Sequence, residues 1–148
     1  MTQDYVPPRA VVAADVVCVL NQPDLTSVLL IERANDPFKG EYAIPGGIVE
    51  ETEDVIDGAI RELLEETNIS ASEADLTLLG IYGKPGRDPR GRTITVAYYF
   101  MTSDSSLFSN VKAQDDAKSF KFFDIFNLPD LAFDHNKIIS DLIKRLNL

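Results

Sequence analysis

The sequence predicts an α/β fold, in which a sheet of several strands combines with two helices. Apolar residues recur at three- and four-residue steps from Ile56 to Thr67 and from Asn136 to Leu146, which is typical of amphipathic helices. Runs rich in β-branched and aromatic residues, bounded by Gly, Pro, Asn and Asp, indicate strands in the rest of the chain. A chain of 148 residues with 45% hydrophobic content can bury one core, so a single domain over residues 1–148 is expected.

Two strands are expected before the first helix and three between the helices. Their ranges are Val11 to Leu20, Ser27 to Arg33, Leu76 to Tyr82, Thr93 to Met101 and Phe120 to Phe123. The turn Asn21-Gln22-Pro23-Asp24 should join the first pair. The stretch from Ser103 to Gln114 is polar, rich in Ser and without periodicity, so a loop is expected there. Asp134 is a candidate N-cap of the last helix.

The first helix should bury one apolar stripe and carry acids on the opposite side. The expected stripe is Ile56, Ala59, Ile60, Leu63, Leu64 and Thr67. Glu62, Glu65 and Glu66 then fall together, because residues three and four apart are neighbours on a helix. Thr52 is the predicted N-cap. Gly58 lies mid-helix, where a missing side chain leaves room for a ligand or for backbone, or reflects tight packing alone.

The three glutamates stand in the last two helical turns, where the helix dipole is negative and Lys or Arg is expected. A row of acids is ordinarily a solvated face. Here, however, like charges at these spacings destabilise the helix by roughly 0.2–0.5 kcal/mol per pair, and only Arg61 relieves them. Sequences break local rules mainly at functional sites. The cluster is therefore predicted to bind a divalent cation, Mg²⁺ or Mn²⁺, which prefers oxygen ligands.

Composition excludes several functional classes. The formal net charge of −10 disfavours a general nucleic-acid binder. No apolar run approaches the roughly 18 residues of a membrane span, and the N-terminus lacks the pattern of a signal peptide, so no membrane partner and a cytoplasmic location are expected. The single cysteine, Cys18, excludes a disulfide within the chain and should be a small core residue.

Basic residues gather in the segment Lys84-Pro85-Gly86-Arg87-Asp88-Pro89-Arg90-Gly91-Arg92, which two glycines and two prolines mark as a loop. An acidic protein holds a polyanion only where metal ions or a local basic cluster reverse the field. Arginine suits two-point contacts with phosphate, so Arg87, Arg90 and Arg92 are candidate substrate-binding residues. The alternative is a solvated loop whose arginines pair with surface acids.

The sequence resembles the Nudix hydrolase superfamily. The Nudix box, written glycine, five residues, Glu, seven residues and Arg-Glu-aliphatic-any-Glu-Glu-any-Gly-aliphatic, is matched by Gly47, Glu53, Arg61, Glu62, Leu63, Glu65, Glu66 and Ile69. Asn68 replaces the family's second glycine, and as the next most tolerant residue in a left-handed C-cap it should preserve the turn. The resemblance implies a Nudix α/β/α sandwich with a mixed central sheet, a catalytic helix after the Gly46-Gly47 turn and a C-terminal helix.

The same resemblance implies metal-dependent hydrolysis of a pyrophosphate linked to a nucleoside. Glu62, Glu65 and Glu66 should bind the metal, Mg²⁺ or Mn²⁺, with the Gly46 carbonyl as a further oxygen ligand. Arg61 should orient Glu53 through an ion pair. Many relatives place another acid where this chain has Ser119, so Asp115 and Asp116 are candidates for it, with a turn or cap as their alternative role.

The segment GRDPRGR followed by TITVAYYF resembles a branch of ADP-ribose pyrophosphatases and sensors. This resemblance implies hydrolysis of ADP-ribose to AMP and ribose 5-phosphate, with pyrophosphohydrolysis of nucleoside triphosphates and non-catalytic ADP-ribose sensing as alternatives. Such relatives are commonly homodimers, and residues 6–12 would be available for exchange or pairing between subunits. The lone His135 should be structural or on the surface, although contact with a ligand remains open. Four aromatic side chains are expected either to stack on adenine or to fill the core: Phe38, Tyr82, Tyr98 and Tyr99.

Overall fold

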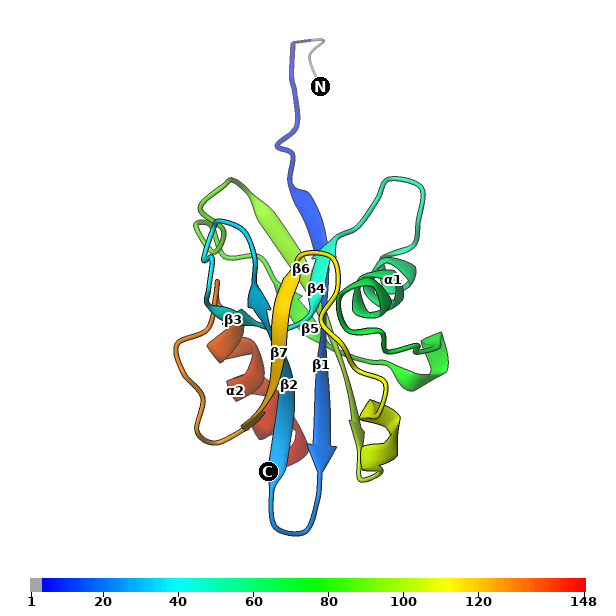
Figure 1. Cartoon of the computed structure of the whole chain (residues 1–148). Coiled ribbons are helices and arrows are strands. Elements are labelled where there is room, and N and C mark those ends of the chain that lie inside the picture. The colour runs from blue at the N-terminus through cyan, green and yellow to red at the C-terminus, as the bar shows by residue number, and fades with distance from the viewer. Residues whose placement is uncertain (1–3) are drawn as a thin grey trace.

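The computed structural model describes residues 4–148, and its elements follow the predicted order (Figure 1). The strands are β1 Val11–Asn21, β2 Thr26–Arg33, β3 Tyr42–Ala43, β4 Gly46–Ile48, β5 Thr77–Tyr82, β6 Thr93–Thr102 and β7 Ala117–Asp124. The α-helices are α1 Val55–Thr67 and α2 His135–Leu146, and two 3₁₀ turns span Glu73–Asp75 and Ser105–Phe108. All five predicted strands are present. The two missed strands, β3 and β4, have two and three residues, too few for an alternating pattern.

The strands form one mixed sheet around β1, as expected. β1 runs parallel to β6 along ten residue pairs, and its other edge is shared by β4 at Ala13 to Asp15 and by β2 at Val19 to Asn21, both antiparallel. β2 continues the sheet through β3 and β7, while β5 closes the far edge beside β6. Because β4 and β2 divide one edge of β1, the strands separate around Asp15 and Val16.

The two helices cover opposite faces of the sheet, which confirms the predicted α/β/α arrangement (Figure 1). Successive side chains of a strand point to opposite faces. Val16 and Cys18 accordingly pack with Ala59 and Leu63 of α1, and the alternate residues of β1 pack with α2. Cys18 is fully buried, as predicted, and burial raises the pKa of its thiol. No helix within residues 4–148 is both long and apolar enough to cross a bilayer.

The ends and faces of α1 differ in part from expectation. Asp54, not Thr52, is the N-cap, and its carboxylate accepts from the Val55 N–H at 2.7 Å, because the helix starts two residues later than predicted. Asn68 takes the expected left-handed conformation, at φ 65°. Leu64 is 43% exposed rather than buried, since it lies at the edge of the stripe. Glu66, expected among the exposed acids, is instead buried at 6% exposure.

Candidate active site

Gly46 and Gly47 are the first two residues of strand β4, and α1 packs against this strand. A Cβ atom on Gly47 would overlap the carboxyl group of Glu62, and one on Gly46 would overlap the Asp15 carboxylate. The Gly46 N–H donates to Glu66 Oε1 at 2.8 Å. Gly47 is therefore required for the Glu62 carboxylate of α1 to approach this backbone so closely, and Gly46 is required for β4 to lie against Asp15 of β1.

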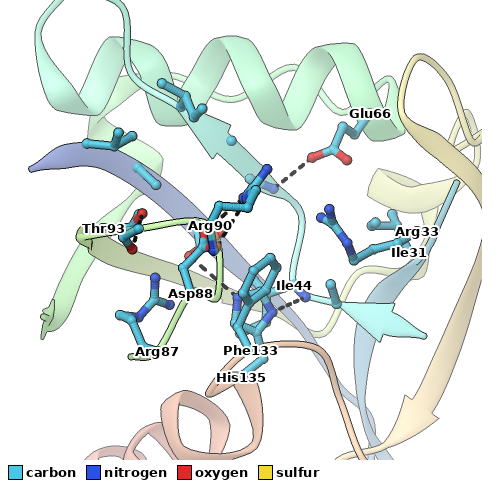
Figure 2. Close-up of a pocket in the computed structure, with 18 of the residues that line it drawn as sticks. Ile31, Arg33, Ile44, Glu66, Arg87, Asp88, Arg90, Thr93, Phe133 and His135 are labelled. Carbon is cyan, nitrogen blue, oxygen red and sulfur yellow. Dashed lines mark hydrogen bonds and ion pairs between the residues drawn. The ribbon is translucent and has the colours of Figure 1, made fainter. Parts of the chain in front are cut away.

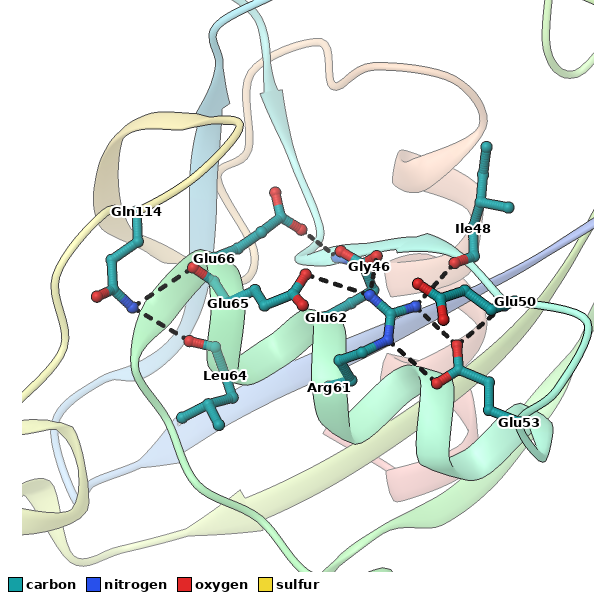
Figure 3. A network of polar contacts seen from close by, with 10 residues as sticks. All are labelled: Gly46, Ile48, Glu50, Glu53, Arg61, Glu62, Leu64, Glu65, Glu66 and Gln114. Atoms are coloured by element: carbon teal, nitrogen blue, oxygen red, sulfur yellow. Dashed lines mark hydrogen bonds and ion pairs between the residues drawn. The ribbon is translucent and has the colours of Figure 1, made fainter.

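Arg61 is the centre of an ion-pair network on the exposed side of α1 (Figure 3). Its guanidinium donates to Glu53 at 2.7 and 3.1 Å, to Glu62 at 2.8 Å and to Glu65 at 3.2 Å. A further bond, at 3.0 Å, reaches the carbonyl of Ile48. The loop before α1 is thus fixed to the helix through one side chain.

Gly58 makes room for this same loop. A Cβ there would lie 3.0 Å from both Glu53 Oε1 and a methyl group of Val49. The absent side chain is therefore explained by packing of the loop's side chains, not by a ligand or a stretch of backbone.

The network and the burial of α1 divide the acids into two groups. The hydrogen bonds from Arg61 lower the pKa of Glu53 to about 2, so Glu53 is ionised at neutral pH. Burial raises the pKa of Glu62, although Arg61 opposes the shift. Burial also raises the pKa of Glu66, to about 8, with repulsion from Glu62 and Asp15 adding to it. Glu66 has no ion-pair partner among the described residues, so it is the carboxylate that gains most from a cation.

The predicted metal ligands have the right donor atoms for a divalent ion, but Arg61 determines the positions of two of the three carboxylates. Their donors are carboxylate oxygens, which Mg²⁺ and Mn²⁺ prefer. Glu62 and Glu66 lie beside the neighbouring glycines Gly47 and Gly46 of strand β4. Within residues 4–148, no three acidic, His or Cys side chains already surround one point as an ion would require, because Arg61 holds oxygens of Glu62 and Glu65. The chemistry of the donor set fits a divalent ion, and metal binding itself stays a prediction.

A cavity of about 330 Å³ extends from Glu66 to the basic loop between β5 and β6 (Figure 2). It is enclosed by β1, β2, the β3–β4 turn, the basic loop and the segment that leads into α2. Its polar lining residues are Asp15, Arg33, Glu66, Arg87, Asp88, Arg90, Arg92, Thr93 and His135, and its apolar walls include Ile31, Ile44 and Phe133. Glu66 of α1 and the basic loop, distant in sequence, therefore line one cavity, whereas Glu62 and Glu65 are not among its lining residues.

The basic loop is held by its own ion pairs, which changes the interpretation of Arg87. Both carboxylate oxygens of Asp134 accept from Arg87, at 2.6 and 3.0 Å, and the Arg87 side chain is only 4% exposed. Burial would raise the pKa of Asp134, but these bonds outweigh it and lower the pKa. Arg87 thus anchors the loop to α2 through Nε and Nη2, while its Nη1 makes no hydrogen bond to the residues that the structure describes. For the same reason Asp134 stands at the N-cap position without capping the helix through its side chain.

Arg90 is oriented by the buried Asp88, which accepts from its guanidinium at 2.9 and 3.1 Å. The Arg90 side chain remains 53% exposed, and Arg92 is exposed as well. All three predicted arginines line the cavity, and Arg90 and Arg92 are more exposed than Arg87.

Arg33, at the end of β2, is a cavity residue that the sequence analysis missed. Its Nε donates to the Pro37 carbonyl at 2.8 Å, and its guanidinium stacks 5.0 Å from the Phe133 ring centroid, on a ring that also contacts Arg90 at 5.8 Å. Burial, followed by repulsion from Arg90, lowers the pKa of Arg33. No acid pairs with Arg33 in the described chain, which suits it to an anionic ligand. Strand position alone gave no signal for this role.

Several other candidate residues are not among those that line the cavity. Asp116 accepts weakly from Asn35, at 3.4 Å, and its charge raises the pKa of Glu66, while that of Asp115 raises the pKa of Glu62. Ser119 donates to Glu32 at 2.9 Å instead of facing α1. Among the aromatic residues, Tyr98 is in the core, and Phe38 packs edge-on against Phe133.

Comparisons with known proteins agree with this architecture. The model of the NUDIX domain family matches residues 10–146. An ADP-ribose pyrophosphatase of Methanocaldococcus jannaschii is 47% identical over 81% of this chain and 68% of its own length. An ADPR responsive transcriptional repressor of Acinetobacter baylyi is 33% identical over 81% of this chain, which spans only 48% of that repressor.

Solved structures are similar over nearly the whole chain. The NUDIX domain of Shewanella oneidensis NrtR, complexed with ADP ribose, has a TM-score of 0.81 and 29% identity, with 99% of both chains covered. A bifunctional NMN adenylyltransferase/ADP ribose pyrophosphatase of Francisella tularensis, complexed with AMP and Mn ion, has a TM-score of 0.80 and 31% identity, covering 93% of this chain and 42% of that one.

Proposed function

The chain belongs to the NUDIX domain family, and from this membership we propose that it is a metal-dependent pyrophosphohydrolase that cleaves ADP-ribose to AMP and ribose 5-phosphate. The observation that carries the proposal is the cavity itself, in which the buried Glu66 and the unpaired Arg33 line one space. Because Glu66 has no cationic partner and Arg33 has no anionic partner among the described residues, together they suit a diphosphate bound to a metal ion. The 47% identity to an ADP-ribose pyrophosphatase supports the choice of substrate.

In this proposal the residues of α1 have two roles, metal binding and the orientation of the carboxylates. Glu62, Glu65 and Glu66, with the Gly46 carbonyl, hold Mg²⁺ or Mn²⁺, and Arg61 orients Glu53 and the exposed carboxylates. The bound ion would neutralise charge on the phosphates and lower the pKa of the attacking water. The neighbour complexed with AMP and Mn ion supports a divalent metal in this family.

The basic side of the cavity would bind the diphosphate. Arg90 and Arg33 stack on the same aromatic ring, so their guanidinium groups are already ordered and lose little freedom on binding. Arg92 adds positive charge at the rim, and Phe133 and Ile44 exclude water from the buried end. Asp115 and Asp116 are the proposed source of an additional acid, because their charges already act on Glu62 and Glu66.

We further propose that residues 1–148 act as one domain, in the cytoplasm and as a homodimer, without a nucleic-acid partner. The exposed, apolar side chains of Val6, Val11 and Val12 at the N-terminal end of β1 support pairing between subunits. The net charge of −10 opposes binding to a phosphate backbone.

A sensor that binds ADP-ribose without cleaving it is the second candidate, because an ADPR responsive repressor is among the relatives. The complete set of box acids in this chain favours catalysis. A panel of ADP-ribose, dinucleotides and nucleoside triphosphates, incubated with Mg²⁺ and separated by chromatography, tests both. AMP and ribose 5-phosphate from ADP-ribose, at the highest kcat/KM of the panel, are expected. Calorimetric binding of ADP-ribose without turnover would support the sensor, and preference for a triphosphate would overturn the substrate.

A further inference from the structure

Two buried polar side chains, Asp15 and His135, line the cavity without belonging to the metal-binding helix or the basic loop. Asp15 lies in the middle of β1 and His135 is the first residue of α2. Their side chains are 9% and 4% exposed. Buried polar groups are normally hydrogen-bonded, so a donor or acceptor that has no partner in the protein indicates what kind of ligand group could bind there.

His135 presents a hydrogen-bond donor to the cavity. Its Nδ1 accepts from the Ile44 N–H at 2.9 Å, and therefore carries no proton (Figure 2). Burial lowers the pKa of His135, so the ring is neutral and its one proton sits on Nε2. Nε2 lies 3.7 Å from Asp15 Oδ2, too far for a hydrogen bond. Since no unpartnered side-chain nitrogen or oxygen is sealed from solvent among residues 4–148, this N–H is open to the cavity.

Asp15 presents an acceptor beside this donor. Its Oδ2 accepts from the Thr95 hydroxyl at 2.6 Å, while Oδ1 lies against Gly46 and receives no hydrogen bond from the described residues. Within residues 4–148, no lysine or arginine forms an ion pair with Asp15. The wall of the cavity next to Gly46 therefore offers one free donor and one free acceptor, on side chains that packing holds in place.

This wall is unsuitable for phosphate. Asp15 is close enough to Glu66 for its charge to raise the pKa of that carboxyl, so two acids already crowd this end of the cavity. The unpaired Arg33 and the exposed Arg90 provide the attractive surface for an anion. The ligand group that fits between Asp15 and His135 is neutral, and it both donates and accepts a hydrogen bond.

We propose that Asp15 and His135 bind the hydroxyl groups of a ribose in the substrate, with one hydroxyl donating to the Asp15 carboxylate and an adjacent oxygen accepting from His135 Nε2. The inference rests on the proposed function, and it assigns to Asp15 and His135 the specificity of the enzyme for a substrate that contains ribose. A ribose is favoured over a base, because Asp15 lies directly against Gly46, whose N–H holds Glu66. In a nucleoside diphosphate the ribose hydroxyls are one ring away from the phosphate, whereas the base lies beyond that ring.

The wild-type enzyme provides the first test. A site built to bond a hydroxyl rejects an analogue that lacks it, because its buried polar groups are left unpaired. Two analogues of ADP-ribose are compared with ADP-ribose itself in the presence of Mg²⁺, each lacking the 2-hydroxyl of a different ribose. One analogue should have a KM about tenfold or more above that of ADP-ribose, and the other should have a KM closer to it. Equal KM values for ADP-ribose and both deoxy analogues would overturn the inference. The absence of any ADP-ribose turnover would instead refute the proposed function, and ribo- and deoxyribonucleoside triphosphates would then serve for the same comparison.

Asp15→Asn provides the second test, since it keeps the shape and an acceptor for Thr95. The ratio of the deoxy to the ribo KM should fall towards one, because the variant loses the charged acceptor for the ribose hydroxyl and the KM for ADP-ribose itself rises. Tyr82→Phe, which removes a hydrogen bond to Asp141 outside this cavity, is the control and should keep the wild-type ratio. A purely structural role for Asp15 would lower the melting temperature and leave the ratio unchanged. Loss of discrimination against the inosine analogue of ADP-ribose, with the deoxy ratio retained, would overturn the assignment to ribose in favour of the base.

Discussion

Arg61 and Glu53 are joined by two hydrogen bonds, from Nη2 to Oε1 at 2.7 Å and from Nε to Oε2 at 3.1 Å, across eight residues of sequence. Glu53 in turn accepts from the Glu50 N–H, so the pair ties the turn before α1 to the middle of the helix. The same guanidinium holds Glu62 and Glu65. One arginine thus fixes both the entry to the helix and the carboxylates proposed to bind metal.

Arg61→Lys tests this dependence. A lysine keeps the charge but cannot make the two-point contact, so unfolding free energy should fall by about 1–3 kcal/mol and kcat by more than tenfold. Urea unfolding and steady-state kinetics measure both. Lys137→Gln, which removes an exposed ion pair with Asp141 at 3.4 Å, is the control and should cost less than about 0.5 kcal/mol. Equal losses in the two variants would contradict the role of Arg61.

The periodic part of the fold could be predicted from the sequence, and its long-range pairings could not. The strands and both helices have enough residues to show their period, whereas β3 and β4 have two and three. The box motif indicated Glu66, but not its burial, because acids are assigned to exposed faces unless a partner is known. Arg33 had no motif at all, and its stacking on Phe133 depends on two distant segments meeting.

Gly47→Ala should disturb the acidic cluster without unfolding the protein. The new Cβ would overlap the Glu62 carboxyl, which must then move, so kcat should fall by about tenfold or more while the circular dichroism spectrum stays unchanged. The matched control is Gly80→Ala in β5, where the nearest atom is an ordinary 3.6 Å away, and activity should remain close to wild type. Normal kinetics for Gly47→Ala would show that the Glu62 carboxyl need not lie against Gly47 of β4.

Glu66→Gln should separate metal binding from folding. Since burial penalises the charged carboxylate, the metal-free variant should be at least as stable as wild type. Addition of Mg²⁺ should raise the melting temperature of the wild type more than that of the variant, because an ion stabilises only the state that binds it. We expect kcat to fall by at least about a hundredfold. Identical shifts with Mg²⁺ in differential scanning fluorimetry would argue against Glu66 as a ligand.

His135 should make the protein less stable in mild acid. Burial lowers the pKa of His135 in the folded state, so the unfolded chain binds the proton more readily. Stability is therefore fully present above the unfolded pKa of about 6.5 and is lost as pH falls below it. His135→Gln removes this titration, so the unfolding free energy of the wild type minus that of the variant should decrease as pH falls from about 7.5 to 5.5. Glu66, whose pKa of about 8 acts in the opposite direction in this range, contributes to both proteins and leaves the difference unaffected. A difference that stays constant with pH in urea titrations would exclude a role for His135.

Arg87 and Asp134 should act as one unit that positions the basic loop. Asp134 accepts both hydrogen bonds of the Arg87 guanidinium, so removal of either partner should free the loop and raise KM for ADP-ribose. If anchoring is the whole role of Arg87, then Arg87→Met, Asp134→Asn and the double variant should raise KM by similar factors, because the second change removes nothing that the first left intact. Arg92→Met, which alters an exposed side chain at the rim, should raise KM additively with Asp134→Asn. Additive effects of Arg87→Met and Asp134→Asn would instead show that Arg87 contacts the substrate directly.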